Sequence, residues 1–221
     1  QMGDSLHDPA DSLAEVTVRL LEKARYSIII PENVGNLCCG KAFETRGLLE
    51  EADAKAAELD KALLDSSGNG QIPILCETSP CLARMRKVMD DRLQLYEPVE
   101  FATKYLLKRL KLTRQYGRIA IHPTCSTRLL ELEEKLLSLA EQCSDQVVWP
   151  RNIQCCGFSG DRGFSHPELN RSALETLADQ IKECEEGFST SRTCEIGLSL
   201  HGKIPYKNIF YMLDRCADTA K

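Results

Sequence analysis

Apolar residues along the chain alternate between two spacings, one typical of amphipathic helices and the other typical of buried strands. The first helical stretch covers residues 13–24, and Ser12 with Glu15 three positions later forms a capping-box pattern at its start. The β-rich run 26–30 follows directly and predicts a buried strand. The pattern therefore predicts a helix that leads into a strand.

This alternation continues along the chain and restarts near residue 113. In the first half, the pattern predicts a helix over 44–64, a strand over 72–76 and a helix that Ser79 caps, with Pro80 at its first position. The strands predicted for the second half are at 118–122, 146–150 and 187–190. Three helices are also predicted: one ends near 142, one starts near a second capping box at 165–168, and one follows 191.

Strands that alternate with helices pair in parallel and are covered by helices. In each half, a Cys-Cys-Gly triplet follows a predicted strand, at Cys38-Cys39-Gly40 and again at Cys155-Cys156-Gly157. We therefore predict an α/β fold in two pseudo-repeated halves, with parallel sheets flanked by helices and CCG loops at the carboxyl ends of strands. The predicted domains are residues 1–112, the first CCG repeat, and residues 113–221, the second.

Composition narrows the class of protein. The formal net charge of −5 argues against a nucleic-acid partner, which would require clustered Lys and Arg. The sequence contains no run of 18 apolar residues and so predicts no membrane span. The first residues lack the basic and apolar regions of a signal peptide. We expect a cytoplasmic protein, or one peripheral to the inner membrane. The chain starts with Gln1 instead of Met, which suggests a fragment of a longer chain, a trimmed product or a residue left from cloning.

Cysteine is the residue type that stands out, with 11 cysteines among 221 residues. An odd number without an export signal favours a reducing compartment and metal or cluster binding over disulfides. Several of these cysteines follow a predicted strand, where open α/β sheets collect ligands. They are Cys38, Cys39, Cys125, Cys155, Cys156 and Cys194, and Cys76 and Cys81 bracket a similar turn.

A cluster of iron and sulfide suits such turns, because helix N-termini and free N–H groups stabilise its negative charge and lower the pKa of nearby thiols. Gly40 and Gly157 allow tight turns whose N–H groups point at sulfur. Adjacent cysteines do not readily form a disulfide with each other, and zinc more typically uses Cys-x-x-Cys pairs. The vicinal pairs therefore favour a cluster over a single zinc ion.

Other chemistry-bearing residues have simpler interpretations. Cys143, Cys184 and Cys216 are expected to be small buried hydrophobic residues. His122 either hydrogen-bonds near the cluster or is an ordinary residue at the end of a strand. The glycine-rich stretch 157–163 lacks the Gly-Lys-Ser/Thr ending of a phosphate loop, so we expect it to shape the loop around the cluster.

The quoted motifs resemble the cysteine-rich CCG domain of heterodisulfide reductases, of lactate-utilisation proteins and of the iron–sulfur subunits of glycolate oxidase and anaerobic glycerol-3-phosphate dehydrogenase. A narrower resemblance is to the C-terminal iron–sulfur part of FAD-linked D-lactate dehydrogenases. The segments that carry it are Pro31–Asn33, Leu37–Gly40, His122–Ser126, Cys155–Phe164, Pro167–Leu169 and Ser191–Gly197.

The resemblance implies a site for an iron–sulfur cluster, most simply 4Fe-4S, on Cys125, Cys155, Cys156 and Cys194. The family's CCG pattern ends in Cys-x-x-Cys, and in this chain Ser191 stands in place of the first of those two cysteines, three residues before Cys194. A further site is implied at Cys38, Cys39 and Cys81, with Cys76 close by. Its spacing Cys76-x4-Cys81 departs from the family pattern, and no cysteine precedes the pair among residues 1–37.

The resemblance also implies a function. The whole protein would be an FAD-dependent D-lactate (2-hydroxy acid) dehydrogenase, with FAD on an N-terminal flavin domain outside this sequence and electrons passing to a quinone or cytochrome. The chain itself would contain no catalytic residue and would not oxidise lactate alone. The alternatives are a heterodisulfide-reductase-like or other CCG iron–sulfur oxidoreductase subunit, and a zinc-stabilised or metal-free interaction module.

Overall fold

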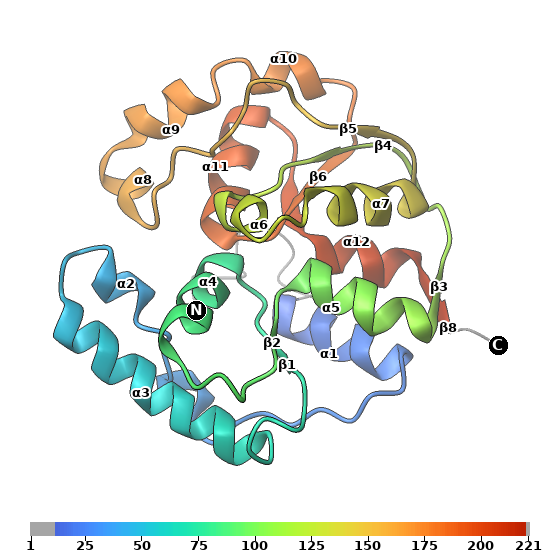
Figure 1. Ribbon diagram of the computed structural model, residues 1–221. Helices are drawn as coiled ribbons and strands as arrows, with labels where there is room; N and C mark the ends of the chain where they lie inside the picture. Colours follow the sequence, from blue (N-terminus) through green and yellow to red (C-terminus); the bar gives the residue numbers. More distant parts are fainter. Residues whose placement is uncertain (1–11, 220–221) are drawn as a thin grey trace. The chain divides into compact units, whose positions relative to one another are not determined.

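The computed structural model describes residues 12–219 and has a mixed α/β architecture of parallel sheets and helices (Figure 1). The stretch 1–11, for which the sequence predicts no signal peptide, lies outside the described residues. Contacts divide the chain into two compact units. The larger unit combines the N-terminal segment up to Ser27 with the residues from Val99 onward, and the smaller unit is Ile28–Pro98.

The larger unit is built on a four-stranded parallel sheet in the order β5-β4-β6-β7. The strands are β4 (Tyr116–Ile121), β5 (Ser144–Val148), β6 (Glu186–Ser189) and β7 (Tyr206–Asn208). The helices that connect or follow them are α6 (Cys125–Leu129), α7 (Glu133–Cys143), α8 (Arg162–Ser165), α9 (Pro167–Ala173), α10 (Leu177–Ile181), α11 (Arg192–Gly202) and α12 (Ile209–Cys216). Because the strands are parallel, the carboxyl ends of β4, β5 and β6 meet at one edge of the sheet.

The core of this unit explains why β4 is central. Ile119, Ala120 and Ile121 are completely buried, so both faces of the strand are covered. Phe188 of β6 and Leu198 of α11 are also completely buried. Burying each large apolar side chain contributes roughly 1.5–3 kcal/mol, and this burial fixes the positions of the strand ends.

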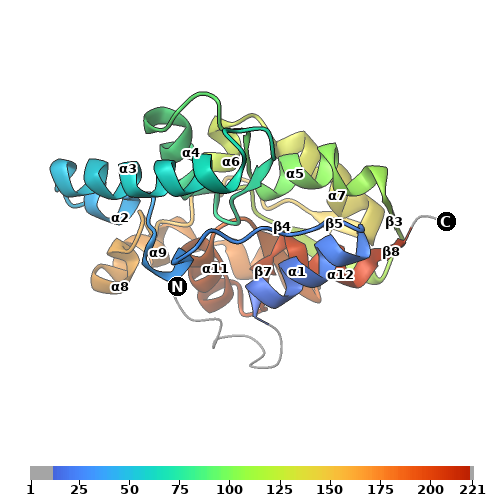
Figure 2. The same ribbon diagram turned by 90° about the horizontal axis from the view of Figure 1, so that it is seen from below.

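Segments from the two ends of the described chain complete the larger unit. Helix α1 (Leu13–Lys23) lies beside α12 (Figures 1 and 2). Arg19 and Lys23 of α1 form ion pairs with Asp214 of α12 at 2.7 and 2.8 Å. The remaining elements are α5 (Pro98–Lys104), η3 (Leu106–Lys108) and the antiparallel pair β3 (Leu110–Leu112) with β8 (Ala217–Thr219).

The smaller unit contains a two-stranded parallel sheet, in which Ile74 is opposite Leu95. Its elements are η2 (Val34–Asn36), α2 (Lys41–Glu44), α3 (Leu49–Ser66), β1 (Ile74–Leu75), α4 (Ser79–Val88) and β2 (Leu95–Tyr96). Ala52 of α3 and Leu82 of α4 are completely buried between the helices. This unit therefore depends on helix packing more than on its short strands.

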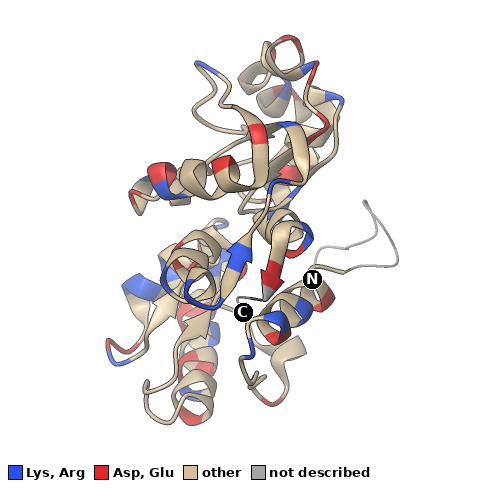
Figure 3. Cartoon of the chain, turned by 90° about the vertical axis from the view of Figure 1, so that its right-hand side faces the viewer, with Lys and Arg blue, Asp and Glu red and all other residues tan. Residues whose placement is uncertain are grey.

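Surface charge is mixed. Figure 3 shows Lys and Arg interspersed with Asp and Glu along the helices. Within the described part of the chain, no helix combines the length and the apolar character that crossing a bilayer requires.

Several predicted elements are confirmed. The capping box at Ser12 and Glu15 forms, with backbone-to-side-chain hydrogen bonds of 3.2 and 2.8 Å. The predicted strand at 187–190 corresponds to β6, and the helix predicted after 191 corresponds to α11. Pro80 lies in the first turn of α4 as expected, but the N-cap residue is Thr78 instead of Ser79.

Other predicted elements are wrong or shifted. The run 26–30 is not a strand, and Ile29 and Ile30 are 56% and 63% exposed. The first CCG loop, at Cys38, therefore does not follow a strand as predicted, and the element before it is η2. β-branched residues favour extended backbone, but a strand also needs a ladder partner, which this run lacks in the described structure. The helix predicted over 44–64 begins at Leu49 instead, because Gly47 adopts the left-handed conformation with φ of 79°.

The second half shows two further differences. The helix predicted to end near residue 142 is divided into α6 and α7, because Glu131 between them has a φ of 54°. The capping box predicted at 165–168 does not form, since the N-cap residue of α9 is His166 and its side chain makes no capping bond. The predicted boundary between residues 112 and 113 concerns repeated motifs, whereas the compact units divide elsewhere. The pseudo-repeat therefore stays a prediction.

Candidate functional site

The two Cys-Cys-Gly turns have the same local geometry. In the first turn, the Gly40 N–H donates to the Cys38 Sγ at 3.3 Å. In the second turn, the Gly157 N–H donates to the Cys155 Sγ at the same distance, 3.3 Å. Both glycines are left-handed, with φ of 80° and 71°. The turns therefore point a backbone N–H at sulfur, as the sequence predicts.

Each of these glycines also packs directly against the backbone of a helix. A Cβ added to Gly40 would lie 2.1 Å from the carbonyl oxygen of Ala52 in α3. A Cβ added to Gly157 would lie 2.5 Å from the carbonyl oxygen of Leu169 in α9. Only glycine allows this approach, which fixes each turn against a helix.

The second cysteine cluster consists of Cys125, Cys155, Cys156 and Cys194 in the larger unit. Cys125 begins α6 after β4, the vicinal pair lies in the loop after β5, and Cys194 is in the first turn of α11 after β6. The Cys155 thiol is hydrogen-bonded to those of Cys125 and Cys156, and the Cys156 and Cys194 sulfurs are 2.9 Å apart. The structure therefore brings the four predicted residues together at the carboxyl edge of the sheet.

The contacts within the second cluster make its thiols unequal. Hydrogen bonds from Cys125 and then from Cys156 lower the pKa of the Cys155 thiol far below its usual value. The same hydrogen bonds raise the pKa of the Cys125 thiol and the Cys156 thiol, with burial adding to the effect. Cys155 is therefore the thiol of this cluster that loses its proton most readily, and the Gly157 N–H also stabilises the resulting negative charge.

A network of hydroxyl groups lies at the start of α6, next to Cys125 along the chain. Thr124 caps α6 by accepting from the Thr127 N–H at 3.1 Å. The Thr127 and Thr190 hydroxyls are 2.8 Å apart, which joins α6 to the end of β6. Thr190 is completely buried, and the sequence did not single it out.

His122 lies at the end of β4 beside this cluster. It is 1% exposed, and burial lowers the pKa of its imidazole to about 4. Among the described residues its Nε2 atom has no hydrogen-bond partner. A buried imidazole of this kind is neutral at physiological pH.

The first cysteine cluster consists of Cys38, Cys39, Cys76 and Cys81 in the smaller unit. Cys76 follows β1, and Cys81 is in the first turn of α4. The Cys81 thiol hydrogen-bonds to Cys39 and lowers the pKa of the Cys39 thiol to about 6. Burial raises the pKa of Cys76 to about 12. As in the second cluster, one thiol is the preferred thiolate.

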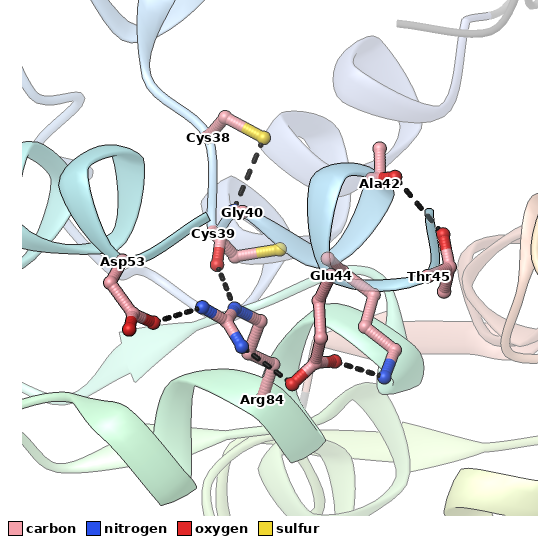
Figure 4. A network of polar contacts seen from close by, with 9 residues as sticks. Cys38, Cys39, Gly40, Ala42, Glu44, Thr45, Asp53 and Arg84 are labelled. Atoms are coloured by element: carbon pink, nitrogen blue, oxygen red, sulfur yellow. Dashed lines mark hydrogen bonds and ion pairs between the residues drawn. The ribbon is translucent and has the colours of Figure 1, made fainter. Parts of the chain in front are cut away.

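Arg84 lies beside the first cluster and was not identified from the sequence. Its Nε donates to the Cys39 carbonyl oxygen at 2.8 Å (Figure 4). Its two terminal nitrogens bind Glu44 at 2.6 Å and Asp53 at 2.7 Å. The guanidinium also lowers the pKa of the Cys39 thiol, after the larger effect of Cys81. A basic residue on α4 was visible in the sequence, but only the tertiary structure places it at the turn.

The donor sets determine which metal groups fit. Within residues 12–219, no three His, Cys, Asp or Glu side chains are arranged to hold a single metal ion. Several cysteine thiols gathered at one place, with glycine N–H groups pointing at sulfur, form the kind of donor set that a multi-iron cluster uses. The second cluster provides four such thiols, which fits a 4Fe-4S centre.

The remaining cysteines lie outside both clusters. Cys143 and Cys216 are completely or almost completely buried and are hydrogen-bonded to each other. Cys184 is buried in the core formed by α10, α11 and β7. These environments match the expectation that they act as small buried residues.

Comparison with known proteins identifies distant relatives of the chain. Over 209 residues the chain is 23% identical to lactate utilization protein A of Geobacillus kaustophilus, with 87% of this chain and 84% of that protein covered. It is 24% identical over 206 residues to lactate utilization protein A of Macrococcus caseolyticus, with 87% and 83% covered.

A third relative has a different name. The chain is 24% identical over 190 residues to a subunit of the anaerobic glycerol-3-phosphate dehydrogenase of Escherichia coli, with 74% of this chain and 48% of that protein covered. The chain is thus distantly related to proteins of both names. Residues 119–199, which include every cysteine of the second cluster, match the CCG family of cysteine-rich domains.

Proposed function

We propose that the chain is an iron–sulfur, electron-transfer subunit of a CCG-type oxidoreductase. The observation that carries this proposal is the convergence of Cys125, Cys155, Cys156 and Cys194 inside the segment that matches the CCG domain. The donor set is that of a 4Fe-4S cluster, which supplies one-electron transfer when bound. The chain would bind such clusters and control their environment, and would catalyse no step of its own.

The residues in and around the second cluster would have different roles. Cys125, Cys155, Cys156 and Cys194 would be the ligands, and the first negative charge would be at Cys155. The Gly157 N–H, now bound to the Cys155 sulfur, would stabilise that charge. Cys156 and Cys194 are 3% and 7% exposed, so the protein would shield that side of the site from water.

The first cluster, Cys38, Cys39, Cys81 and Cys76, would be a second cluster site by the same reasoning. It has the same turn, a thiol with a lowered pKa and a buried guanidinium nearby. The match to the CCG family does not extend to it.

The partner would supply the flavin. Lactate utilization protein A of Geobacillus kaustophilus is matched over 84% of its length, which favours a subunit of a multi-chain complex over part of a fused dehydrogenase. The more specific function, the iron–sulfur part of an FAD-linked D-lactate dehydrogenase with a quinone or cytochrome acceptor, stays a prediction from the resemblance. So do FAD itself and a location at the inner membrane.

The relatives' names indicate two substrate classes for the complex, lactate and glycerol 3-phosphate. Lactate is favoured because that relative is covered almost completely, whereas 48% of the glycerol-3-phosphate dehydrogenase chain is covered. In either case, substrate oxidation would take place on the flavin partner. The isolated chain should therefore oxidise neither compound.

The test is anaerobic purification of the whole chain, followed by iron and sulfide analysis and visible absorption. We expect iron and sulfide in similar amounts, with broad absorption that bleaches on reduction. Protein without iron or sulfide after anaerobic reconstitution would contradict the proposal. Zinc in place of iron in the same samples would favour an interaction module instead.

A further inference from the structure

In both CCG turns, a buried side chain holds the carbonyl oxygen of the second cysteine. In the first turn, the Arg84 Nε donates to the Cys39 carbonyl. In the second turn, the Asn170 Nδ2 donates to the Cys156 carbonyl. Arg84 and Asn170 are 4% and 2% exposed, so water does not compete for these carbonyls. The same backbone atom is therefore held by two chemically different side chains.

Arg84 connects the turn to the elements around it. It lies on α4 one turn after Cys81, the cysteine whose thiol contacts Cys39. Its guanidinium also binds Glu44 of α2, which directly follows the turn, and Asp53 of α3 (Figure 4). One side chain thus joins the turn to three helices and holds Cys39 opposite Cys81.

Asn170 occupies the corresponding place at the second turn. It lies on α9 next to Leu169, whose carbonyl oxygen is in contact with Gly157. It also packs against Gly197 of α11, where an added Cβ would lie 2.4 Å from the Asn170 Nδ2. Gly197 is one turn after Cys194, the cysteine whose sulfur is 2.9 Å from Cys156. Asn170 therefore joins its turn to the helix that carries the opposite cysteine.

We propose that Arg84 and Asn170 are the positioning residues of the first and second cysteine clusters, each holding a CCG turn against the helix that supplies the facing cysteine. This inference rests on the proposed iron–sulfur function, because positioning the cysteines matters for cluster binding. The two residues differ in charge. Asn170 positions its turn without charge, whereas Arg84 also places a buried positive charge beside the first cluster.

The first test needs no metal and measures amide hydrogen exchange in the reduced, metal-free chain. Arg84→Met should accelerate exchange about tenfold or more in the peptide over residues 38–41 only, because the turn loses its carbonyl partner. Asn170→Leu should do the same only over residues 155–158. If either variant leaves exchange in its own turn unchanged, that residue does not position it.

Matched controls separate positioning from general destabilisation. Arg86, on the same helix as Arg84, donates to the Leu95 carbonyl at 2.7 Å, away from the turn. Asn208 caps α12 by accepting from the Phe210 N–H. Arg86→Met and Asn208→Ala should leave exchange in both turns unchanged relative to global unfolding. Accelerated turn exchange in these controls would overturn the proposal.

The second test uses protein reconstituted anaerobically with iron and sulfide. Arg84→Lys keeps the positive charge but loses the planar guanidinium with its several N–H donors, whereas Arg84→Met loses both the charge and the donors. Both variants should retain less iron at the first cluster, and only Arg84→Met should lower the reduction potential of what remains. Equal potentials in the two variants would overturn the role of the charge.

The outcomes of the two tests distinguish a failure of the proposed iron–sulfur function from a failure of the proposed positioning role. Wild-type chain that binds no iron would contradict the iron–sulfur function, while the exchange experiment would still decide whether Arg84 and Asn170 hold the turns. Normal iron content in all variants, together with accelerated exchange, would show positioning of the turns without a role in cluster binding and would overturn this inference.

Discussion

The two cysteine clusters share a turn but are set in different surroundings. In the second cluster, the ligand candidates come from the ends of three adjacent parallel strands, and a network of neutral hydroxyls joins α6, which begins with Cys125, to the end of β6. In the first cluster, the turn packs on helices beside a two-stranded sheet, and an ion-pair network surrounds it. The CCG turn is therefore a local structure that does not depend on one kind of sheet, whereas its electrostatic environment depends on the fold around it.

This difference has a consequence for stability. The hydroxyl network of the second cluster, which includes Thr124, Thr127 and Thr190, carries no charge and does not change with pH in the physiological range. The network of the first cluster joins a buried guanidinium to two carboxylates, and the lowered pKa of one of them, Glu44, makes its stability depend on pH.

The largest effect should follow from removing the vicinal sulfurs of one cluster at a time. If each cluster binds its own iron, the double variants Cys38→Ser/Cys39→Ser and Cys155→Ser/Cys156→Ser should each lose about half of the iron and sulfide after anaerobic reconstitution. Cys184→Ser is the control and should lose none. Full iron content in the Cys38→Ser/Cys39→Ser protein would show that the first cluster is not a metal site.

The next largest effect concerns the glycine of each turn. Gly40→Ala and Gly157→Ala should each destabilise the metal-free chain by about 2–3 kcal/mol, because the left-handed backbone and the approach of a helix carbonyl both oppose a Cβ. Urea unfolding measures this change.

Two control glycines separate the cost of the left-handed backbone from the cost of the close approach of a helix carbonyl. Gly47 has φ of 79° but no atom within 4 Å of an added Cβ, so Gly47→Ala should cost about 1 kcal/mol. Gly35 has neither constraint, so Gly35→Ala should change stability by less than about 0.5 kcal/mol. If Gly40→Ala and Gly47→Ala cost the same, the close packing of the turn on α3 contributes nothing.

A smaller effect is expected at the hydroxyl network of the second cluster. Thr124→Ala removes the N-cap of α6 and should destabilise the chain by about 1 kcal/mol. Thr124→Ser keeps the capping oxygen and should restore most of that loss. Equal stabilities for the two variants in urea would mean that the cap does not stabilise α6.

The smallest effect should be the pH dependence that the ion pairs of Glu44 contribute at the first cluster. Contacts with Lys41, and then with Arg84, hold the pKa of Glu44 below its ordinary value. The unfolded chain therefore binds a proton at this residue at a higher pH than the folded chain does, and stability falls as the pH drops through this range.

Unfolding measured from neutral to acidic pH in wild type and Glu44→Gln tests this. The Glu44→Gln protein should be less stable at neutral pH and should show a shallower loss on acidification, since one paired carboxylate is gone. Identical slopes for the two proteins would mean that Glu44 is not stabilised by its ion pairs.

The sequence alone was sufficient for the features that depend on neighbouring residues. The CCG turns, their glycines and the cysteines that follow the strands of the larger unit could be predicted, because these conformations are set by a few adjacent residues. The capping box of α1 and the strands around 118–122 and 187–190 were also predictable, since local pattern and burial agree there.

Only the tertiary structure decided the features that join residues far apart in the chain. Arg84 is 45 residues from Cys39, and Thr127 is 63 residues from Thr190, so no local pattern links them. The run 26–30 fails as a strand for the same reason, because backbone preference cannot supply a ladder partner. Local sequence thus determined the turns that carry the cysteines, whereas long-range packing decided which side chains hold those turns and which charges surround them.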